Sequence, residues 1–187
     1  MQGRVVAFGG RSLDGQEPKY LNSPESEIFE KGKMLFAFEK ASSDIRKRDK
    51  AIIVEGYFDV ISLHSKGITN SVASLGTALN KYQISQLCRC TDNKNIILNF
   101  DSDNAGILAT KRVIKEVETL SLHDQINLKI LQLSHFKDPD EYLNSHTPED
   151  YFNLIDNSSF WIDWEIDQIF KDQDLTKSEI FQSVISS

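Results

Sequence analysis

The hydrophobic pattern in the middle of the chain is typical of a parallel sheet. Residues 51–54 (AIIV) form an unbroken apolar run that ends at Glu55 and Gly56, and residues 95–100 (NIILNF) form a second, largely apolar run that ends at Asp101. Short apolar runs bounded by turn residues predict strands that are buried on both faces. The centre of the chain is therefore predicted to be a sheet domain whose strands end in acidic residues.

Helical spacing alternates with these strands. Gly67 stands where a glycine commonly ends a helix. After the first acidic strand, the pattern predicts a helix over 58–66, a strand over 70–74, a helix over 81–89, the second acidic strand, a helix from Asp103 to residue 120, and a strand over 125–133. This alternation predicts an α/β fold with a mostly parallel sheet covered by helices on both faces.

The flanks have a different pattern. Residues 4–8 (RVVAF) predict a strand, residues 27–41 place apolar side chains at helical spacing, and residues 40–50 are polar with a basic cluster. Thr147 and Pro148 predict the start of a helix, because threonine caps and proline fits the first turn. Acidic amphipathic helices are expected to follow. The chain is thus predicted to divide into residues 1–48, 49–145 and 146–187.

Charge and apolar content limit the classes of function. The net charge is −7, but residues 138–187 hold 12 acidic against 2 basic side chains, so the rest of the chain is close to neutral. The acidity therefore does not exclude nucleic-acid binding by the body of the chain. No run approaches the ~18 apolar residues of a membrane span, and we expect a cytoplasmic protein with no membrane partner.

The two cysteines do not form a metal-binding pattern. Cys88 and Cys90 are a C-x-C pair with no second pair and no nearby histidine. This spacing favours two reduced thiols on or near a helix over a metal or redox site. No zinc is therefore expected in this chain.

Acidic side chains gather at the predicted carboxyl edge of the sheet. Glu55 ends one strand, Asp59 follows four residues later, and Asp101 and Asp103 follow the other strand. Carboxylates brought together repel each other unless a cation neutralises them or one is protonated. Ligation by oxygen alone suits Mg²⁺ or Mn²⁺. A metal site is one reading, and solvated or helix-capping acids are the alternative.

Two motifs resemble a known fold. Residues 55–59 (EGYFD) and 101–106 (DSDNAG) resemble the signatures of the Toprim fold, which primases, topoisomerases and some nucleases share. Further blocks resemble the bacterial DnaG-type DNA primase family and lie in the same order, at 8–11 (FGGR), 18–25 (PKYLNSPE), 31–32 (KG), 67–70 (GITN), 73–78 (ASLGTA) and 137–141 (KDPDE). The resemblance covers about residues 3–145. It implies a Rossmann-like Toprim sheet, part of an α+β amino-terminal subdomain and a helical carboxy-terminal extension.

The resemblance implies a nucleotidyltransferase that makes short RNA primers for DNA replication. Its implied partners are a single-stranded DNA template, ribonucleoside triphosphates and, through a domain absent here, the replicative helicase at nucleoid-associated forks. By position in the family motifs, the catalytic metal ligands would be Glu55, Asp101 and Asp103. Further acids around the metal would be Asp59, Asp138 and Asp140. Nucleotide or template contacts would come from Arg11, Lys19 and Lys31. Two Mg²⁺ or Mn²⁺ ions are expected during catalysis.

Some positions depart from the family pattern. Phe58 stands where methionine is common, and Ser102 and Asn104 replace glycine and a basic residue, which removes one expected cation from that loop. Neither the amino-terminal zinc module nor the carboxy-terminal helicase-binding domain of such primases is present. We therefore expect a catalytic-core fragment with little or no activity on its own.

Rival readings remain open. Another Toprim enzyme, a nuclease or topoisomerase, is one, although Tyr57 inside a buried signature is a poor nucleophile. A non-catalytic DNA-binding scaffold is another, and such scaffolds can lose the acids that Glu55, Asp101 and Asp103 retain here. Each single lysine is as consistent with an exposed structural residue as with a contact.

Overall fold

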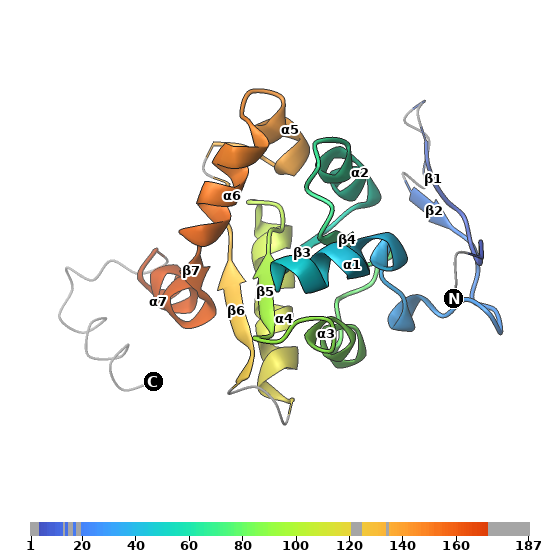
Figure 1. Cartoon of the computed structure of the whole chain (residues 1–187), viewed down its shortest axis with the longest axis horizontal. Coiled ribbons are helices and arrows are strands. Elements are labelled where there is room, and N and C mark those ends of the chain that lie inside the picture. Colours follow the sequence, from blue (N-terminus) through green and yellow to red (C-terminus); the bar gives the residue numbers. More distant parts are fainter. Residues whose placement is uncertain are drawn as a thin grey trace.

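A five-stranded sheet forms the centre of the protein, and a two-stranded hairpin lies at one side of it (Figure 1). The computed structural model describes residues 4–12, 14, 17, 20–120, 125–133 and 135–171. Its strands are β1 (Gly9–Arg11), β2 (Tyr20–Asn22), β3 (Ala51–Val54), β4 (Ser71–Ala73), β5 (Asn95–Leu98), β6 (Asn127–Ile130) and β7 (Ser159–Phe160). Its helices are η1 (Lys31–Lys33), α1 (Phe38–Arg48), α2 (Tyr57–Ser65), α3 (Lys81–Cys88), α4 (Asn104–Glu118), α5 (Pro139–Leu143), α6 (Pro148–Asp156) and α7 (Trp161–Lys171).

The predicted parallel sheet is confirmed. The strand order is β4-β3-β5-β6-β7, and β3 pairs in parallel with both β4 and β5. Ile52 lies opposite Ser71 on one side and Ile97 on the other. Only the edge strand β7 runs antiparallel, against β6. All four residues of β3 are fully buried, which is why its sequence is uninterrupted by polar side chains.

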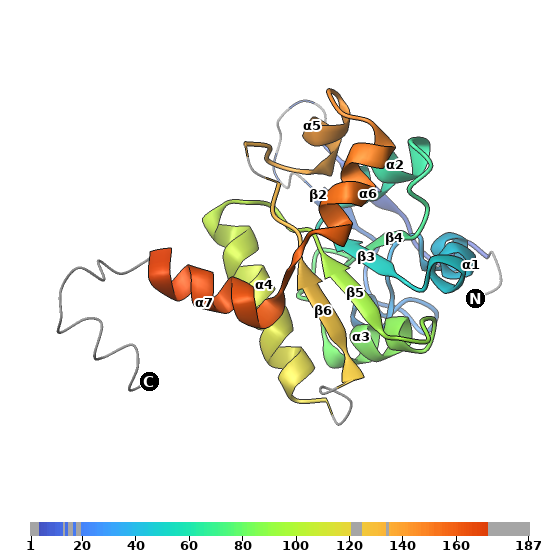
Figure 2. The same ribbon diagram turned by 60° about the vertical axis from the view of Figure 1, so that its left-hand side comes forward.

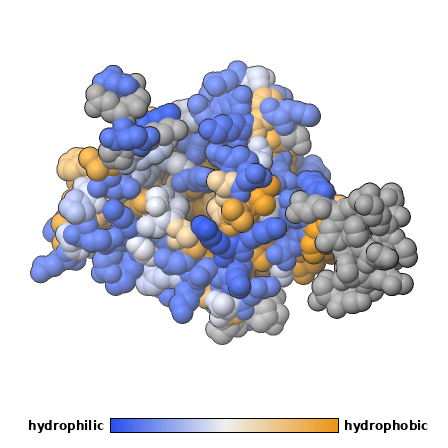
Figure 3. All heavy atoms as spheres, turned by 180° about the vertical axis from the view of Figure 1, so that it is seen from behind, coloured by the Kyte–Doolittle hydropathy of each residue, from blue (hydrophilic) through white to orange (hydrophobic). Residues whose placement is uncertain are grey.

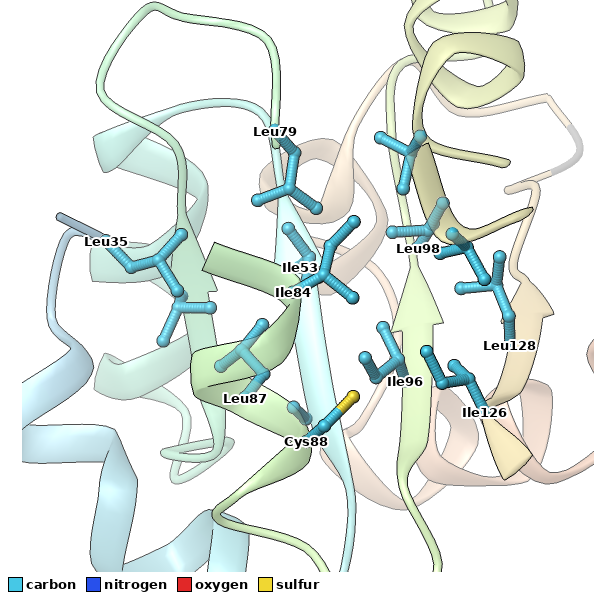
Figure 4. Close-up of a cluster of buried hydrophobic side chains, with 14 of the residues drawn as sticks. Leu35, Ile53, Leu79, Ile84, Leu87, Cys88, Ile96, Leu98, Ile126 and Leu128 are labelled. Atoms are coloured by element: carbon cyan, nitrogen blue, oxygen red, sulfur yellow. The ribbon is translucent and has the colours of Figure 1, made fainter. Parts of the chain in front are cut away.

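Alternate side chains of the central strands enter two separate cores. Ile53 of β3 and Ile96 and Leu98 of β5 lie on one face, where they pack against α3 and α4 (Figure 4). Cys88 lies in this core and Cys90 is buried beside it, and both are free thiols. Burial raises the pKa of the Cys88 thiol to about 11. The two cysteines therefore serve as apolar packing.

The opposite face of the sheet carries the second core. Ile52, Val54 and Ile97 point to this side, and α2, α5 and α6 cover it (Figure 2). Tyr151 of α6 is fully buried there, and its hydroxyl donates to Asn99 Oδ1 at 2.7 Å. Helices therefore cover both faces, as the alternating pattern predicted.

The strand order creates a switch point between β3 and β5. From β3 the chain passes through α2 to β4 on one side, and later returns through α3 to β5 on the other side of β3. Connections that leave in opposite directions open a crevice at the carboxyl ends of the two strands, and open α/β sheets bind their ligands there. Glu55 and Asp101 stand at those two ends.

The predicted strand at residues 4–8 is wrong. Pairing begins only at Gly9, where β1 forms an antiparallel hairpin with β2. Val5 is 74% exposed and Phe8 is 78% exposed. Residues 4–7 pair with no strand in the described part of the chain, and Phe8 only extends the end of the hairpin, where its carbonyl oxygen accepts from Ser23 N at 2.9 Å. The apolar pattern alone therefore does not make a sheet.

The helix expected over residues 27–41 is also wrong for most of its length. Phe36 is extended and pairs with the edge strand β4, because its N–H donates to Ala73 O at 2.8 Å. Ala37 then takes a left-handed conformation with φ 62°, and α1 begins at Phe38. Tertiary pairing with the sheet therefore overrides the local helical spacing.

The carboxy-terminal segment begins as predicted. Thr147 caps α6, where its hydroxyl accepts from Asp150 N at 3.2 Å. Exposed apolar side chains follow on α7, among them Ile162, Ile166 and Ile169. Figure 3 shows the rear of the molecule as largely hydrophilic, with apolar patches near its centre and beside the grey atoms. Residues 172–187 of the predicted helical extension lie outside the described residues, and no helix among those described could span a membrane.

Candidate functional site

The two acidic strand ends meet. Glu55 follows β3 directly, and Asp101 follows β5 after Asn99 and Phe100. The backbone N–H of Asp101 donates to Glu55 Oε1 at 3.1 Å. The first signature is thus joined to the second by a hydrogen bond across the switch point, as the parallel pairing of β3 and β5 predicted.

A close backbone approach shapes the loop of the second signature. Asp103 ends the loop as the N-cap of α4, where its Oδ1 accepts from Gly106 N at 2.9 Å. Gly106 is buried, and a Cβ atom placed on it would overlap the carbonyl oxygen of Asp101 and lie 2.8 Å from the carbonyl carbon. Only glycine lets the first turn of α4 pack against the backbone of Asp101.

Three further predicted acids are held by the helices beside this edge. Asp59 lies in the first turn of α2, and its Oδ2 accepts from Gly56 N at 2.9 Å. Asp138 caps α5, accepting from Glu141 N at 2.9 Å. Asp140 Oδ1 accepts from Ser62 Oγ at 2.7 Å, which joins α5 to α2. Each acid therefore has a structural contact that by itself would account for its position.

One cleft of about 360 Å³ collects most of the predicted site. Its acidic wall is formed by Glu55, Asp59, Asp101, Asp138 and Asp140. Arg11, at the end of β1, lines the same cleft from the hairpin. A cation from the amino-terminal segment thus lies at the same cleft as carboxylates from the sheet domain.

The remaining predicted residues do not line this cleft. Asp103 lies beside it at the N-terminus of α4. Lys31 belongs to η1, which packs against α3, and its carbonyl oxygen accepts from Gln83 Nε2 at 3.3 Å. Lys19 lies outside the described residues. The structure therefore groups Arg11 with the acids and leaves Lys31 apart from them.

Burial and mutual repulsion disfavour the charged form of two of these acids. Burial raises the pKa of the Glu55 carboxyl, and the charge of Asp101 raises it further. Burial also raises the pKa of Asp59 to about 6, against the hydrogen bond from Gly56 N–H, and the charges of Asp138, Asp101 and Asp140 add to the rise. The raised pKa of Glu55 follows from its place at the end of a buried strand beside Asp101.

This chemistry suits a divalent cation, although the acids do not converge on a single point. Oxygen donors with raised pKa values are stabilised by a cation that takes the place of their protons. Among the residues that the structure describes, no group of three or more acidic, histidine or cysteine side chains is close enough to hold a metal ion. Mg²⁺ commonly takes one or two carboxylates and fills its other positions with water and substrate phosphates. The donor set therefore fits an open magnesium or manganese site.

Sequence reasoning did not single out several residues that line the cleft. Lys137 adds a second cation, and Tyr20 and Asn22 contribute from β2. All three stand inside the blocks of family resemblance, at 18–25 and 137–141, but neither spacing nor residue type distinguished them from their neighbours. The hairpin brings Tyr20 and Asn22 to the cleft, and the segment between β6 and α5 brings Lys137.

Tyr57 has a structural role in this arrangement. Its hydroxyl donates to Asn22 Oδ1, and Asn22 Nδ2 donates to Leu75 O at 3.1 Å. Burial raises the pKa of the Tyr57 phenol, which makes it a weaker nucleophile at neutral pH. This arrangement agrees with the expectation that Tyr57 is a poor candidate for the covalent chemistry of a topoisomerase.

Two substitutions at Asp103 separate helix capping from metal binding. Asparagine also caps helices, so Asp103→Asn should leave the free energy of unfolding within ~0.5 kcal/mol of wild type, whereas Asp103→Ala should lose about 1 kcal/mol. Both variants should weaken Mn²⁺ binding if the carboxylate is a ligand. Urea unfolding and Mn²⁺ titration by electron paramagnetic resonance measure the two effects. Unchanged Mn²⁺ affinity in both variants would leave Asp103 with the capping role alone.

Comparisons with family models match both parts of the chain. A model described as Toprim-like matches residues 52–143, and a model described as the N-terminal domain of the DNA primase catalytic core matches residues 1–42. All six predicted carboxylates lie inside the first match, and Arg11 lies inside the second.

Individual relatives cover nearly the whole chain. The DNA primase of Synechococcus elongatus is 52% identical over 187 residues, which are 100% of this chain and 27% of that protein. The primase catalytic core of Escherichia coli superposes with a TM-score of 0.82 at 32% identity, over 97% of this chain and 57% of that one. A DnaG primase catalytic domain bound to single-stranded DNA superposes with a TM-score of 0.80 at 32% identity, over 95% and 56%. The chain thus spans about a quarter of the length of the Synechococcus relative.

Proposed function

This chain belongs to the bacterial DnaG-type DNA primase family, and we propose that it carries the catalytic carboxylates for synthesis of RNA primers on single-stranded DNA. The observation that carries the proposal is the cleft at the switch point, where Glu55 and Asp101 share a wall with Asp59 and face Arg11 of the hairpin. A cleft with acids on one side and a cation on the other suits a metal-bound triphosphate.

Glu55, Asp101 and Asp103 are the residues that would hold Mg²⁺ or Mn²⁺, two ions during the reaction. Asp59, Asp138 and Asp140 would add negative charge around them. The bound ions would neutralise charge on the triphosphate and lower the pKa of the attacking 3′-hydroxyl. A nuclease or topoisomerase would use the same acids, but the match of residues 1–42 to a primase domain favours primer synthesis.

Basic side chains would bind the substrates. Arg11 and Lys137 line the cleft and would each supply positive charge to a nucleotide phosphate or to the template backbone. Lys19 and Lys31 stand in family blocks, and we propose that they extend this surface along the template. The similar DnaG catalytic domain that was solved with single-stranded DNA supports this choice of template.

The wider assignments follow from family membership. We propose that the protein acts at replication forks in the cytoplasm, with ribonucleoside triphosphates as substrates, and that a region outside this chain contacts the replicative helicase. The division into residues 1–48, 49–145 and 146–187 stays a prediction, as do the roles of the individual site residues.

A chimera tests the proposed activity. This chain would replace the matching quarter of the Synechococcus elongatus primase, to which it aligns over its whole length. We expect the chimera to make primers from radiolabelled ribonucleotides on single-stranded template, at no less than about a tenth of the parent rate, or ~1.4 kcal/mol of barrier. A chimera that folds and binds template yet makes no primers would refute the proposal.

A further inference from the structure

The amino-terminal hairpin depends on outside contacts for its position. β1 and β2 are three residues each, and all of their residues are exposed except the partly exposed Asn22. An isolated two-stranded hairpin of this length is marginal in water. The position of Arg11 at the cleft must therefore be fixed by contacts from outside the hairpin.

The first signature supplies these contacts. Tyr57 bonds to Asn22 through its hydroxyl, and its ring meets the ring of Tyr20 edge-on with centroids 6.3 Å apart. Phe36 packs on the ring of Tyr57, with the two centroids 5.1 Å apart. Gly9 leaves room for this ring, because a Cβ atom there would lie 2.9 Å from Tyr57 Cε2. Tyr57, two positions after Glu55, thus anchors the hairpin.

The next residue, Phe58, contacts the cation itself. The guanidinium carbon of Arg11 lies 5.3 Å from the ring centroid of Phe58 and 5.6 Å from that of Tyr20. Both rings keep more than two fifths of their surface exposed, and all three side chains line the cleft. The ring of Phe58 therefore contacts an arginine instead of packing into the core.

We propose that Phe58 is a positioning residue, which holds the Arg11 guanidinium at the cleft by a cation–π contact shared with Tyr20. Without the two rings, the long side chain of Arg11 would sample many rotamers in solvent. The rings restrict it to the side of the hairpin that borders the carboxylate cleft. This inference rests on the proposed function only where it says that Arg11 binds nucleotide or template. The contact between the Phe58 ring and the guanidinium does not depend on the proposed function.

A nuclear magnetic resonance experiment tests the contact in the 187-residue chain itself. Phe58→Met keeps an apolar side chain of similar size and removes the aromatic ring. We expect the Arg11 Nε–Hε resonance to move when the ring current is lost, and Leu108→Met to leave it in place. Leu108 is the control because it is an exposed apolar residue on α4 and lines neither this cleft nor the neighbouring cavity that Arg11 also borders. An Arg11 resonance that does not move in Phe58→Met would overturn the proposal.

A double-mutant cycle tests whether Phe58 acts through Arg11. The probe is a fluorescein-labelled oligothymidylate, whose dissociation constant is measured by anisotropy at fixed salt. Exposed cation–π contacts are weak, so Phe58→Met should weaken binding by about two- to fivefold in the Arg11 background and have no further effect in Arg11→Gln. Phe58→Trp should restore the affinity, because tryptophan is the strongest cation–π partner.

The outcomes distinguish this inference from the proposed function. Equal losses in the Arg11 and Arg11→Gln backgrounds would mean that Phe58 contacts the DNA directly, and the positioning role would be wrong. If Arg11→Gln binds the probe as well as wild type does, Arg11 has no template role, and the proposed function loses that contact. In that case the Arg11 resonance alone decides whether Phe58 positions it.

Discussion

Gly106→Ala should destabilise the protein by about 3 kcal/mol, at the upper end of the cost of overpacking. The added Cβ would meet the backbone of Asp101 at its carbonyl group and its nitrogen, the latter at 3.0 Å. A backbone segment cannot turn away as a side chain can. Either the first turn of α4 or the loop that carries Asp101 must therefore move.

This movement should also reach the metal site. Asp101 is bonded to Glu55 through its own N–H, so displacing the loop separates the two acids. We expect Mn²⁺ affinity to fall by about tenfold, which is ~1.4 kcal/mol. Urea unfolding and Mn²⁺ titration of the 187-residue chain measure both effects.

Gly10→Ala is the matched control. No atom lies within 4 Å of a Cβ built on Gly10, so this variant should stay within ~0.5 kcal/mol of wild type and bind Mn²⁺ normally. If Gly106→Ala unfolded at the same urea concentration as the control, the close approach at Asp101 would not be the reason for glycine in the second signature.

Glu55→Gln should leave the chain folded and nearly abolish primer synthesis. Glutamine keeps the shape of the side chain and an oxygen that can accept from Asp101 N–H, but it removes the charge that a cation needs. In the chimera we expect less than about a tenth of the unsubstituted rate, a barrier increase above ~1.4 kcal/mol. Glu149→Gln makes the same chemical change at an exposed position on α6 and should not alter the rate.

The same substitution should change the coupling between cation binding and pH. Because the pKa of Glu55 is raised and that of Asp59 is about 6, a cation must displace protons in mildly acidic solution, and Mn²⁺ affinity should rise with pH through about 6. Calorimetry in buffers of different ionisation enthalpy counts these protons, and Glu55→Gln should release fewer of them. Glu55 would have a structural role only if Glu55→Gln kept more than a tenth of the primer-synthesis rate of the unsubstituted chimera and released as many protons on Mn²⁺ binding.

The central fold could be predicted from local pattern because its strands are buried on both faces. Residues 51–54 and 96–98 are buried on both faces, so their composition alone marks them as interior strands of a parallel sheet. Gly67 confirms the predicted end of α2, since its φ of 83° is one that other residues rarely adopt. These features depend on a few neighbouring residues, so the local sequence is enough to predict them.

The flanks could not be predicted in the same way, because their structure depends on distant partners. Phe36 is extended only because the edge of β4 offers Ala73 as a partner, and the hairpin takes its place from Tyr57 and Asn22. The short strand β7 forms because it pairs with the edge of β6. No local pattern around residues 159–160 predicts this strand. Pairing energy from residues far along the chain decides each of these cases.

For the site, the sequence by itself predicted which acids stand at the strand ends, because Glu55 and Asp101 follow the two largely apolar runs whose burial marks the central strands. Only the tertiary structure decided which cations join them. Arg11 reaches the cleft through the crossing of the hairpin, Lys31 is held away against α3, and Phe58 contacts Arg11 across 47 residues of sequence. Strand ends are set by local burial, whereas the approach of one element to another is set by contacts that neither element encodes alone.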